Sequence, residues 1–369
     1  MFNLFPFNQH KNKKRFGLVS CLNNRGLGTE ARLLKDFFKE YLPEYHFDIF
    51  EIRAGRASKA FDDNWQSNKK FIKWLNQQDY VMTIEHFMPN LYTECKKQNI
   101  KSIWRPNIEW IDATLTADDF NKVNCIITPM QACTDLLTQQ FSLKNVVHMP
   151  WIANLPLLSK QVNTDKTQFL FNAGRGGIGD RRNCEAVIKA FSKVLGQRDD
   201  IEFLLKTQIE LDISSLEAYK GKNFIYHHKN TSYKKNLAYY KNADFSIAPS
   251  KWEGVGFALL ESLYHGTPVL TVDAPPMNQW ITHKTLGYTV PASFVDTDLP
   301  IEYNRDNLHL GLNWVKAAEC SINDLVDGII WLADNKIDFY KTFNKENKNV
   351  LNSRKADFIA AWKTLLAAE

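Results

Sequence analysis

The sequence lacks any long apolar run. None of its 369 residues belongs to a stretch of about 18 consecutive apolar side chains, so we expect no transmembrane helix. The N-terminal segment 1–15 carries its apolar residues first and its basic residues afterwards, which is the reverse of a secretory signal peptide. We therefore expect the protein to remain in the cytoplasm.

Cysteine is scarce and scattered. The six cysteines form no Cys-x-x-Cys pair and no Cys/His cluster with the spacing of a zinc site. Free thiols in a reducing compartment fit this pattern better than a disulfide framework. A strong charge of one sign is also absent. The net charge of +5 fits surface lysines, an anionic ligand, an acidic membrane surface or nucleic acid, and it selects none of them.

What the sequence does contain is a repeated alternation of strand-like and helix-like segments. The first half has expected strands at 16–22, 45–52, 80–84, 100–104, 125–128 and 146–149. A polar, proline-containing linker follows at about 150–167. The second half has expected strands at 168–172, 201–206, 224–227, 244–248 and 268–272, and expected helices at 183–195, 233–241, 257–264, 323–334 and 356–368.

This alternation predicts an α/β protein with two doubly wound, Rossmann-like domains that face a cleft. We expect an N-terminal domain at 1–152, a C-terminal domain at 165–345 and a last helical segment at 346–369. Ligands of open α/β sheets bind beyond the carboxyl ends of the strands. Many enzyme classes share this layout, so the fold alone does not choose a function.

The most informative segment, at 248–268, reads APSKWEGVGFALLESLYHGTP. An expected strand ends at its start, and an expected helix begins at Phe257. Gly254 and Gly256 allow backbone N–H groups to come close to a ligand just before the helix. A helix N-terminus preceded by small residues is a favourable site for phosphate.

Two glutamates eight residues apart lie in this segment. Glu261 is about one turn into the expected helix, where its carboxylate can accept two hydrogen bonds from a ribose diol. Glu253 lies in the loop, where it can reach the hydroxyls of a sugar attached beyond the phosphates. A solvated helix start with an incidental acidic pair is the alternative.

A glycine-rich segment, FNAGRGGIGDRRN, follows the first strand of the second half. It is a literal Gly-x-Gly-x-x-Gly at Gly174, Gly176 and Gly179, which is also the pattern of a dinucleotide-binding turn. Such a turn requires an acidic residue at the end of the next strand. That strand ends with Lys206, so an NAD-dependent enzyme is the less favoured alternative.

The segment with the two glutamates closely resembles the Glu-x7-Glu motif of retaining GT-B glycosyltransferases of the family-4 type. The Pro-Ser pair before it, the Gly-x-Gly inside it and the His-Gly-Thr-Pro after it all match. The resemblance is strong from 168 to 276, fair over 1–35 and one of pattern only in between. It implies the GT-B fold, retention of the anomeric configuration, independence of metal ions, and donor contacts from Gly254, Val255, Gly256 and Phe257.

In the resembling family, two cations bind the donor diphosphate. One follows a glycine at the end of the strand that opens the second domain, and the other stands just before the next helix. Arg175 matches the first position and Arg182 matches the second, with Arg181 as the alternative. The resemblance implies that both neutralise the charge of the leaving group. Lys206 is counted with the donor-binding residues.

The first domain is less informative. The turn that contains Gly26 and Gly28 resembles the glycine loop that approaches the donor phosphates in family-4 enzymes, with Arg25 beside it, although a plain strand-to-helix turn also uses glycines. The family often carries a histidine after a mid-domain strand. Asn107 stands roughly at that position, and His86 is the nearest alternative. Both are catalytic candidates, and Glu109 is an acceptor-side candidate.

A metal ion is not expected. Asp296 and Asp298 form an Asp-x-Asp pair, but they lie in a polar loop with no expected strand before it. The arginines and the helix N-terminus already supply the positive charge that a metal would bring. No cofactor is expected either, since the nucleotide-sugar is a co-substrate.

The resemblance therefore implies a hexosyltransferase that uses a UDP- or GDP-sugar. The acceptor stays open. An envelope glycan or lipid-linked intermediate is favoured, with peripheral contact at the inner face of the membrane through Lys11, Lys13, Lys14, Lys69 and Lys70. A hydroxymethylated base of DNA, as in phage enzymes, is the alternative and also fits the charge. A protein or small-molecule acceptor, or a non-catalytic nucleotide-sugar binder, completes the range.

Overall fold

The computed structural model describes residues 13–23, 26–53, 56–112, 114–160, 162, 165–176, 180–296 and 316–367. The chain divides into two compact units, one made of residues 1–106 and 116–127 and the other of residues 107–115 and 128–369. The short segment 107–115 thus groups with the second half of the chain. The expected domain boundaries at 152, 165 and 345 stay a prediction.

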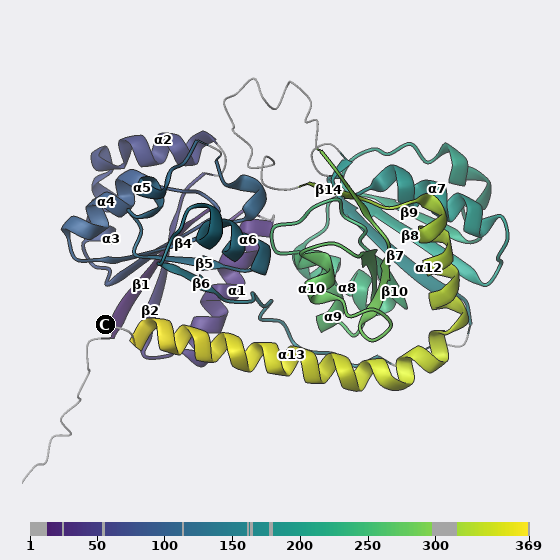
Figure 1. The fold of residues 1–369 in the computed structure, drawn as a ribbon. Helices are drawn as coiled ribbons and strands as arrows, with labels where there is room; N and C mark the ends of the chain where they lie inside the picture. Colours follow the sequence, from purple (N-terminus) through teal and green to yellow (C-terminus); the bar gives the residue numbers. More distant parts are fainter. Residues whose placement is uncertain are drawn as a thin grey trace, which may run out of the picture. The chain divides into compact units, whose positions relative to one another are not determined.

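The first sheet has six strands in the order β2-β1-β3-β4-β5-β6 (Figure 1). They are β1 (Lys14–Ser20), β2 (Tyr45–Glu51), β3 (Tyr80–Ile84), β4 (Lys101–Arg105), β5 (Cys125–Thr128) and β6 (Val146–His148). The helices between them are α1 (Gly26–Tyr41), α2 (Arg56–Asn64), α3 (Lys69–Leu75), α4 (Pro89–Lys97), α5 (Ala117–Phe120) and α6 (Gln131–Asp135).

Buried apolar strands and contacts between aromatic rings stabilise the packing of the first sheet against its helices. Every residue of β3 is buried, as expected for a parallel strand that is covered on both faces. Phe16 of β1 contacts Phe38 of α1 and Phe47 of β2, with ring centroids 4.6 and 5.4 Å away. The sequence predicted these strands because each is a short apolar run between polar turns.

The second sheet also has six strands, in the order β12-β11-β10-β7-β8-β9. They are β7 (Thr167–Gly174), β8 (Ile201–Thr207), β9 (Phe224–His228), β10 (Phe245–Ile247), β11 (Val269–Val272) and β12 (Gly287–Val290). The helices are α7 (Cys184–Leu195), α8 (Tyr233–Asn242), α9 (Phe257–Tyr264), α10 (Met277–Trp280) and α12 (Ile322–Asp334). In Figure 1, α7 and α12 pack together, and α8, α9 and α10 form another group. The predicted α/β class with two doubly wound sheets is confirmed.

A two-stranded antiparallel ribbon of β13 (Ser293–Val295) and β14 (Ala317–Glu319) corrects one expectation. The loop with the Asp-x-Asp pair was expected to have no strand before it, but β13 ends directly before Asp296. Strand β13 is only three residues long and exposed, so the sequence around it shows no alternation of buried and exposed residues. Asp298 lies outside the described residues. Among the described residues, no cluster of three or more His, Cys, Asp or Glu side chains is arranged to hold a metal ion.

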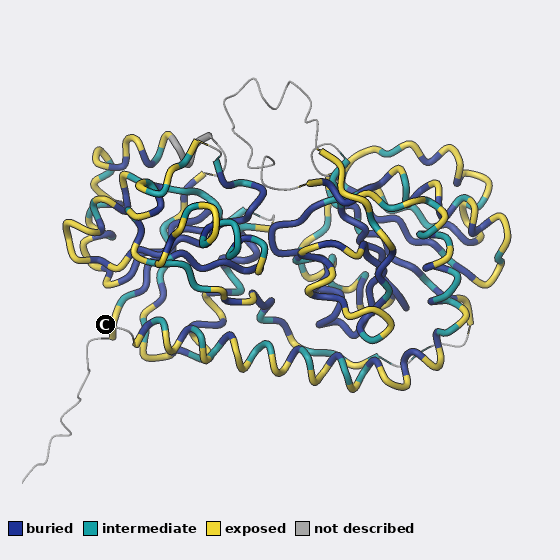
Figure 2. Tube along the Cα trace, in the orientation of Figure 1, coloured by how far each residue is buried: buried dark blue, intermediate teal, exposed yellow. Residues whose placement is uncertain are grey.

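The last helix, α13 (Lys336–Ala367), is longer than predicted, since it begins at Lys336 and not at 356. Its first half is rich in Lys and Asn, and these residues obscure the helical pattern in the sequence. Buried residues nevertheless recur every four positions, at Phe339, Phe343, Asn347 and Leu351. Figure 2 shows exposed residues along the other side of α13 and buried residues along the strands. Whether segment 346–369 reaches the first domain stays a prediction.

Two further findings concern the cysteines and the helices. No disulfide links the six cysteines, all of which the structure describes. Within the described ranges, no helix has both the length and the apolar character needed to cross a membrane.

A buried ion pair joins the start of α13 to the second sheet. Lys336 Nζ lies 3.5 Å from Asp244 Oδ2, and both side chains are under 10% exposed. Asp244 Oδ2 also accepts a hydrogen bond of 2.9 Å from the backbone N–H of Gln168 in β7. Tyr340 donates to the Asp244 carbonyl at 2.5 Å. Asp244 thus connects α13 with two strands.

We expect Asp244→Ala to lower the free energy of unfolding by about 3–5 kcal/mol, because it leaves the Lys336 ammonium buried without its counter-charge. Urea unfolding followed by circular dichroism measures this loss. Asp338→Ala is the matched control, since Asp338 pairs with Lys341 on the exposed side of the same helix. That variant should lose less than about 1 kcal/mol. Equal losses would contradict the argument.

Candidate active site

The second sheet reverses its winding direction between β7 and β10. These two strands are parallel neighbours, while β8 and β9 extend the sheet on one side and β11 and β12 extend it on the other. The loops after β7 and β10 therefore leave the same edge of the sheet and diverge. This switch point is where open α/β sheets bind ligands. The glycine-rich loop follows β7, and the glutamate loop follows β10.

The glutamate loop approaches its neighbours closely because it lacks side chains at two positions. Gly256 is the N-cap of α9 and has a φ of 77°, in the left-handed region that favours glycine. At Gly254, an added Cβ would lie 2.6 Å from the Asn107 side chain and 2.7 Å from Glu109 Oε1. The structure thus places Asn107 and Glu109 directly against the backbone of the glutamate loop.

Glu253 and two arginines form the centre of the site. Arg182 Nη1 lies 2.5 Å from Glu253 Oε1, and Arg181 Nη1 lies 3.8 Å from Glu253 Oε2. The Ser250 hydroxyl donates to Glu253 Oε1 at 2.8 Å. Arg181 Nη1 is also 3.7 Å from Glu109 Oε1. The four charged groups therefore alternate in sign, in the order Glu109, Arg181, Glu253, Arg182.

Burial and positive charge act in opposite directions on Glu253, which is only 6% exposed. Burial acts to raise the pKa of its carboxyl. Arg182, Arg181 and the Ser250 hydroxyl together outweigh burial, so the pKa lies below its ordinary value. Glu253 is therefore a buried anion at neutral pH, and it depends on the arginines for its charge balance.

Local backbone structure explains how the arginines reach this position. The N–H of Arg182 donates to the Gly176 carbonyl at 2.9 Å, which closes the loop after β7. Asp180 then caps α7 by accepting from the N–H of Cys184 at 2.8 Å. The sequence prediction named Arg182 first and Arg181 as its alternative, and the structure brings both to Glu253. Gly179 lies outside the described residues.

Glu261 is the second glutamate, and its surroundings differ. It lies in α9 and is 8% exposed, and the nearby hydroxyls of Tyr233 and Tyr240 act to lower its pKa. Burial raises the pKa of its carboxyl to about 7, and the favourable charges of Arg182 and Lys206 do not offset that. Sequence reasoning missed the two tyrosines, because α8 has no local signal that links it to α9.

Arg175 and Lys206 stand at the ends of β7 and β8. Arg175 is exposed and forms no salt bridge with any described carboxylate. Lys206 is 2% exposed, and burial lowers the pKa of its ammonium while Glu261 acts to raise it. Val255 is buried beside the glycines, and Phe257 opens α9.

The remaining candidates lie in the first unit. Gly26 and Gly28 begin α1, and an added Cβ at Gly28 would lie 2.0 Å from the Asn23 carbonyl oxygen, so this turn requires glycine. Arg25 lies outside the described residues. His86 follows β3 and is partly buried, which lowers its pKa. Its neighbour Glu85 has a φ of 66°, an uncommon conformation for a residue with a side chain.

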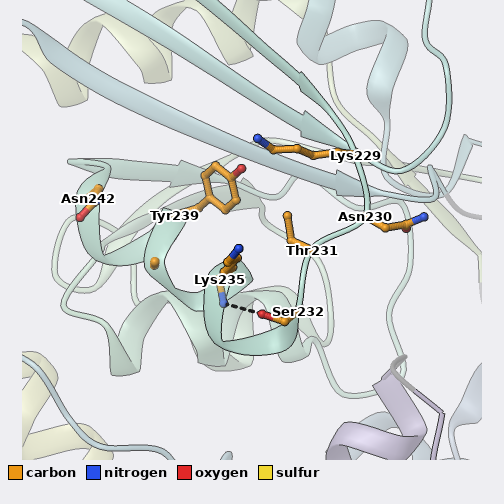
Figure 3. Close-up of a pocket in the computed structure, with 8 residues that line it drawn as sticks. Lys229, Asn230, Thr231, Ser232, Lys235, Tyr239 and Asn242 are labelled. Atoms are coloured by element: carbon orange, nitrogen blue, oxygen red, sulfur yellow. Dashed lines mark hydrogen bonds between the residues drawn. The ribbon is translucent and has the colours of Figure 1, made fainter.

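A separate pocket of about 460 Å³ lies beside β9, with β8 between that strand and β7. Figure 3 shows Lys229 from the loop after β9 and Tyr239 from α8 approaching the same space. The Ser232 hydroxyl caps α8 by accepting from the N–H of Lys235 at 3.4 Å. The pocket is lined by Lys229, Asn230, Thr231, Ser232, Lys235, Ala238, Tyr239 and Asn242.

Residues 158–299 match the family model for glycosyl transferases group 1. This range contains the two loops, with Arg181, Arg182, Glu253 and Glu261. The second half of the chain thus matches this family, as the sequence motifs predicted. Its two six-stranded parallel sheets form the GT-B fold.

One curated relative is alpha-monoglucosyldiacylglycerol synthase of Streptococcus pneumoniae (strain ATCC BAA-255 / R6). It is 31% identical over 121 residues, which are 30% of this chain. The match spans only 26% of that relative's own length. It therefore supports kinship of the matched region rather than equivalence of the whole proteins.

Solved structures share the fold at low identity. Sucrose-phosphate synthase from Thermosynechococcus elongatus is 14% identical with a TM-score of 0.68, and the match covers 96% of this chain and all of that one. The Anabaena protein HepE in complex with UDP and glucose is 10% identical with a TM-score of 0.62, and the match covers 96% and 100% of the two chains. The lipopolysaccharide outer core galactosyltransferase WaaB is 11% identical with a TM-score of 0.60, over 95% and 99%.

The raised pKa of Glu261 predicts a pH-dependent stability. Between about pH 4.5 and 7 the folded chain holds this proton more tightly than the unfolded chain, so the contribution of Glu261 to the free energy of unfolding falls as pH rises. Glu261→Gln removes the group. We expect the stability of this variant relative to wild type to increase by about 1–3 kcal/mol from pH 5 to pH 8. Urea unfolding at both pH values measures it, with exposed Glu210→Gln as the control. Parallel curves for all three proteins would contradict the prediction.

Proposed function

We propose that the protein transfers a hexose from a UDP- or GDP-sugar to a hydroxyl of an envelope glycan or lipid-linked acceptor, with retention of anomeric configuration. The observation that carries the proposal is the Glu253 cluster at the switch point of the second sheet. It combines a buried carboxylate, two arginines and the N-terminus of α9 within a region that matches the glycosyl transferases group 1 model.

Each group has a distinct role in this proposal. Arg175 and Arg182 bind the donor diphosphate and neutralise the charge that develops on it as the bond to the sugar breaks. The N–H groups of Gly256 and Phe257 at the start of α9 face the same phosphates. Glu253 accepts hydrogen bonds from sugar hydroxyls, and Glu261 accepts from the ribose diol. Solved relatives bound to UDP and a sugar support a nucleotide-sugar as the donor.

The proposed acceptor side rests on position and on kinship. Asn107 and Glu109 lie against the glutamate loop, and in this proposal they face an acceptor hydroxyl. The relatives named for diacylglycerol and lipopolysaccharide products favour a lipid-linked or envelope acceptor. Exposed Lys13, Lys69 and Lys70 suit an anionic membrane surface, which fits a peripheral location at the inner face. Lys11 lies outside the described residues.

Nucleotide binding tests the donor half of the proposal. We expect isothermal titration in the presence of EDTA to show binding of UDP or GDP, and weaker binding of ADP and NAD. Arg175→Ala should weaken the preferred nucleotide by about tenfold, because one charge-assisted hydrogen bond to phosphate is lost. Arg198→Ala is the matched control, since Arg198 pairs with Asp200 and Asp334 away from this loop. Binding of NAD alone would overturn the assignment.

Transfer assays test the catalytic half. We expect Glu253→Ala to lose at least about 100-fold in turnover with the preferred donor, because a preorganised group at the reacting sugar is removed. The purified variant should keep the circular dichroism spectrum of the wild type. Near-normal turnover of the Glu253→Ala variant would contradict the role proposed for Glu253.

The acceptor is tested by supplying the donor with anionic vesicles that contain diacylglycerol, or with duplex DNA that contains hydroxymethylcytosine. Radiolabel from the sugar should appear in the lipid fraction. Lys69→Glu with Lys70→Glu should lower vesicle retention, and this loss should be salt-dependent. Label in DNA, with retention that falls steeply with salt, would instead favour the nucleic-acid acceptor.

A further inference from the structure

Arg175 and Arg182 differ in how far each is engaged by the protein itself. Arg175 is exposed and forms no salt bridge within the described residues. Arg182 is 21% exposed, and its Nη1 contacts Glu253 Oε1 at 2.5 Å and Ser250 Oγ at 3.4 Å. Any phosphate that binds the Arg182 guanidinium at that nitrogen must therefore compete with the Glu253 carboxylate.

Glu253 cannot lose this contact without a substitute. It is a buried carboxylate, and removing the partner of a buried charge is costly. Arg181 remains near Glu253 Oε2 at 3.8 Å, but Glu109 shares that guanidinium at a similar distance of 3.7 Å. The Ser250 hydroxyl gives one neutral hydrogen bond at 2.8 Å. The remaining partners therefore compensate Glu253 only in part.

A nucleotide-sugar and a free nucleoside diphosphate carry the same diphosphate, but they differ in the hydrogen-bond donors that they offer to Glu253. A sugar-bearing nucleotide brings hydroxyls that donate to the carboxylate while the diphosphate takes Arg182. A free nucleoside diphosphate takes Arg182 and brings no such donor. Binding of the free nucleotide therefore leaves the buried Glu253 anion poorly compensated.

We propose that the Arg182–Glu253 ion pair makes the site favour the sugar-bearing nucleotide over the free nucleoside diphosphate, and so promotes release of the product after transfer. This inference rests on the proposed function. It adds a second role for Glu253: once the sugar has moved to the acceptor, its carboxylate takes Arg182 back from the diphosphate. Arg182 thus binds the leaving group strongly only while a sugar occupies Glu253.

The test compares two affinities in one variant. Glu253→Gln keeps the shape of the side chain and an oxygen for Ser250, but it removes the charge that holds Arg182. We expect Glu253→Gln to bind UDP about tenfold more tightly than wild type, because Arg182 can then bind the phosphate without first breaking an ion pair. Its affinity for UDP-glucose should not rise in parallel. The ratio of the two dissociation constants should therefore fall by at least about fivefold. GDP and GDP-mannose are used in the same way if wild type prefers guanosine.

A matched control separates the ion pair from a general charge effect. Glu109→Gln removes one negative charge from the same cluster, but from the carboxylate that pairs with Arg181. It should tighten UDP binding much less than Glu253→Gln. In an Arg182→Ala background, Glu253→Gln should give no gain at all. If Glu253→Gln does not fold, Glu253→Asp withdraws the carboxylate from Arg182 by one methylene and should show a smaller gain of the same sign.

The outcomes are distinct. UDP affinity in Glu253→Gln that is unchanged or weaker than in wild type overturns the inference, and so does an equal gain in Glu109→Gln. A gain that persists without Arg182 also overturns it. If neither UDP nor GDP binds wild type or any variant, the proposed function itself has failed.

Discussion

A buried carboxylate needs nearby positive charge, and much of the candidate site is arranged around this requirement of Glu253. The loop after β7 closes through its own backbone so that two consecutive arginines reach the carboxylate. The loop after β10 has no side chain at Gly254, which lets Asn107 and Glu109 approach its backbone. The cluster balances its own charges, so a phosphate that binds Arg182 must compete with Glu253 for that guanidinium.

Glu253 and Glu261 lie near the start of the same helix, but the pKa values of their carboxyl groups are shifted in opposite directions. Glu253 lies just before α9 beside two guanidinium groups, which keep its pKa low despite burial. Glu261 lies two turns later in the same short segment, among tyrosine hydroxyls, where burial dominates and its pKa is raised to about 7. The sequence sets the distance between the two glutamates along the chain. The ionisation of each carboxyl depends on the groups that surround it in the folded structure.

Local patterns predicted the elements well where apolar periodicity is strong. Helix α9 occupies the predicted range 257–264, and every strand predicted in the second half appears within a few residues. The start of α13 was missed, because its buried stripe lies among Lys and Asn residues that resemble a solvated segment. Strand β13 was missed because it is three residues long and exposed, so no buried residue marks it in the sequence.

Sequence motifs predicted those site residues that lie within one motif, but not the contacts between distant parts of the chain. Glu253, Arg182 and Glu261 were named from the sequence, and the structure brings Arg182 to Glu253. Ser250 was recognised only as part of a motif, and the hydroxyls of Tyr233 and Tyr240 were missed, because contacts between α8 and α9 leave no trace in local spacing. Glu109 was named only as an acceptor-side group, and its contact with Arg181 is a long-range feature of the same kind.

The C-terminal helix has a mechanical consequence for the site. Asn347 of α13 donates to the carbonyl of Leu263, near the end of α9, at 2.7 Å. One turn or two further on, Arg354 donates to the Gln279 carbonyl and lies over the Trp280 ring, with 4.7 Å between guanidinium carbon and ring centroid. Trp280 in turn stands beside Gly256. The axis of α9, and with it the direction of its N-terminus, is therefore braced from the far end of the chain. Deletions within α13 therefore remove contacts that hold α9 in place, although they change no residue of the glutamate loop.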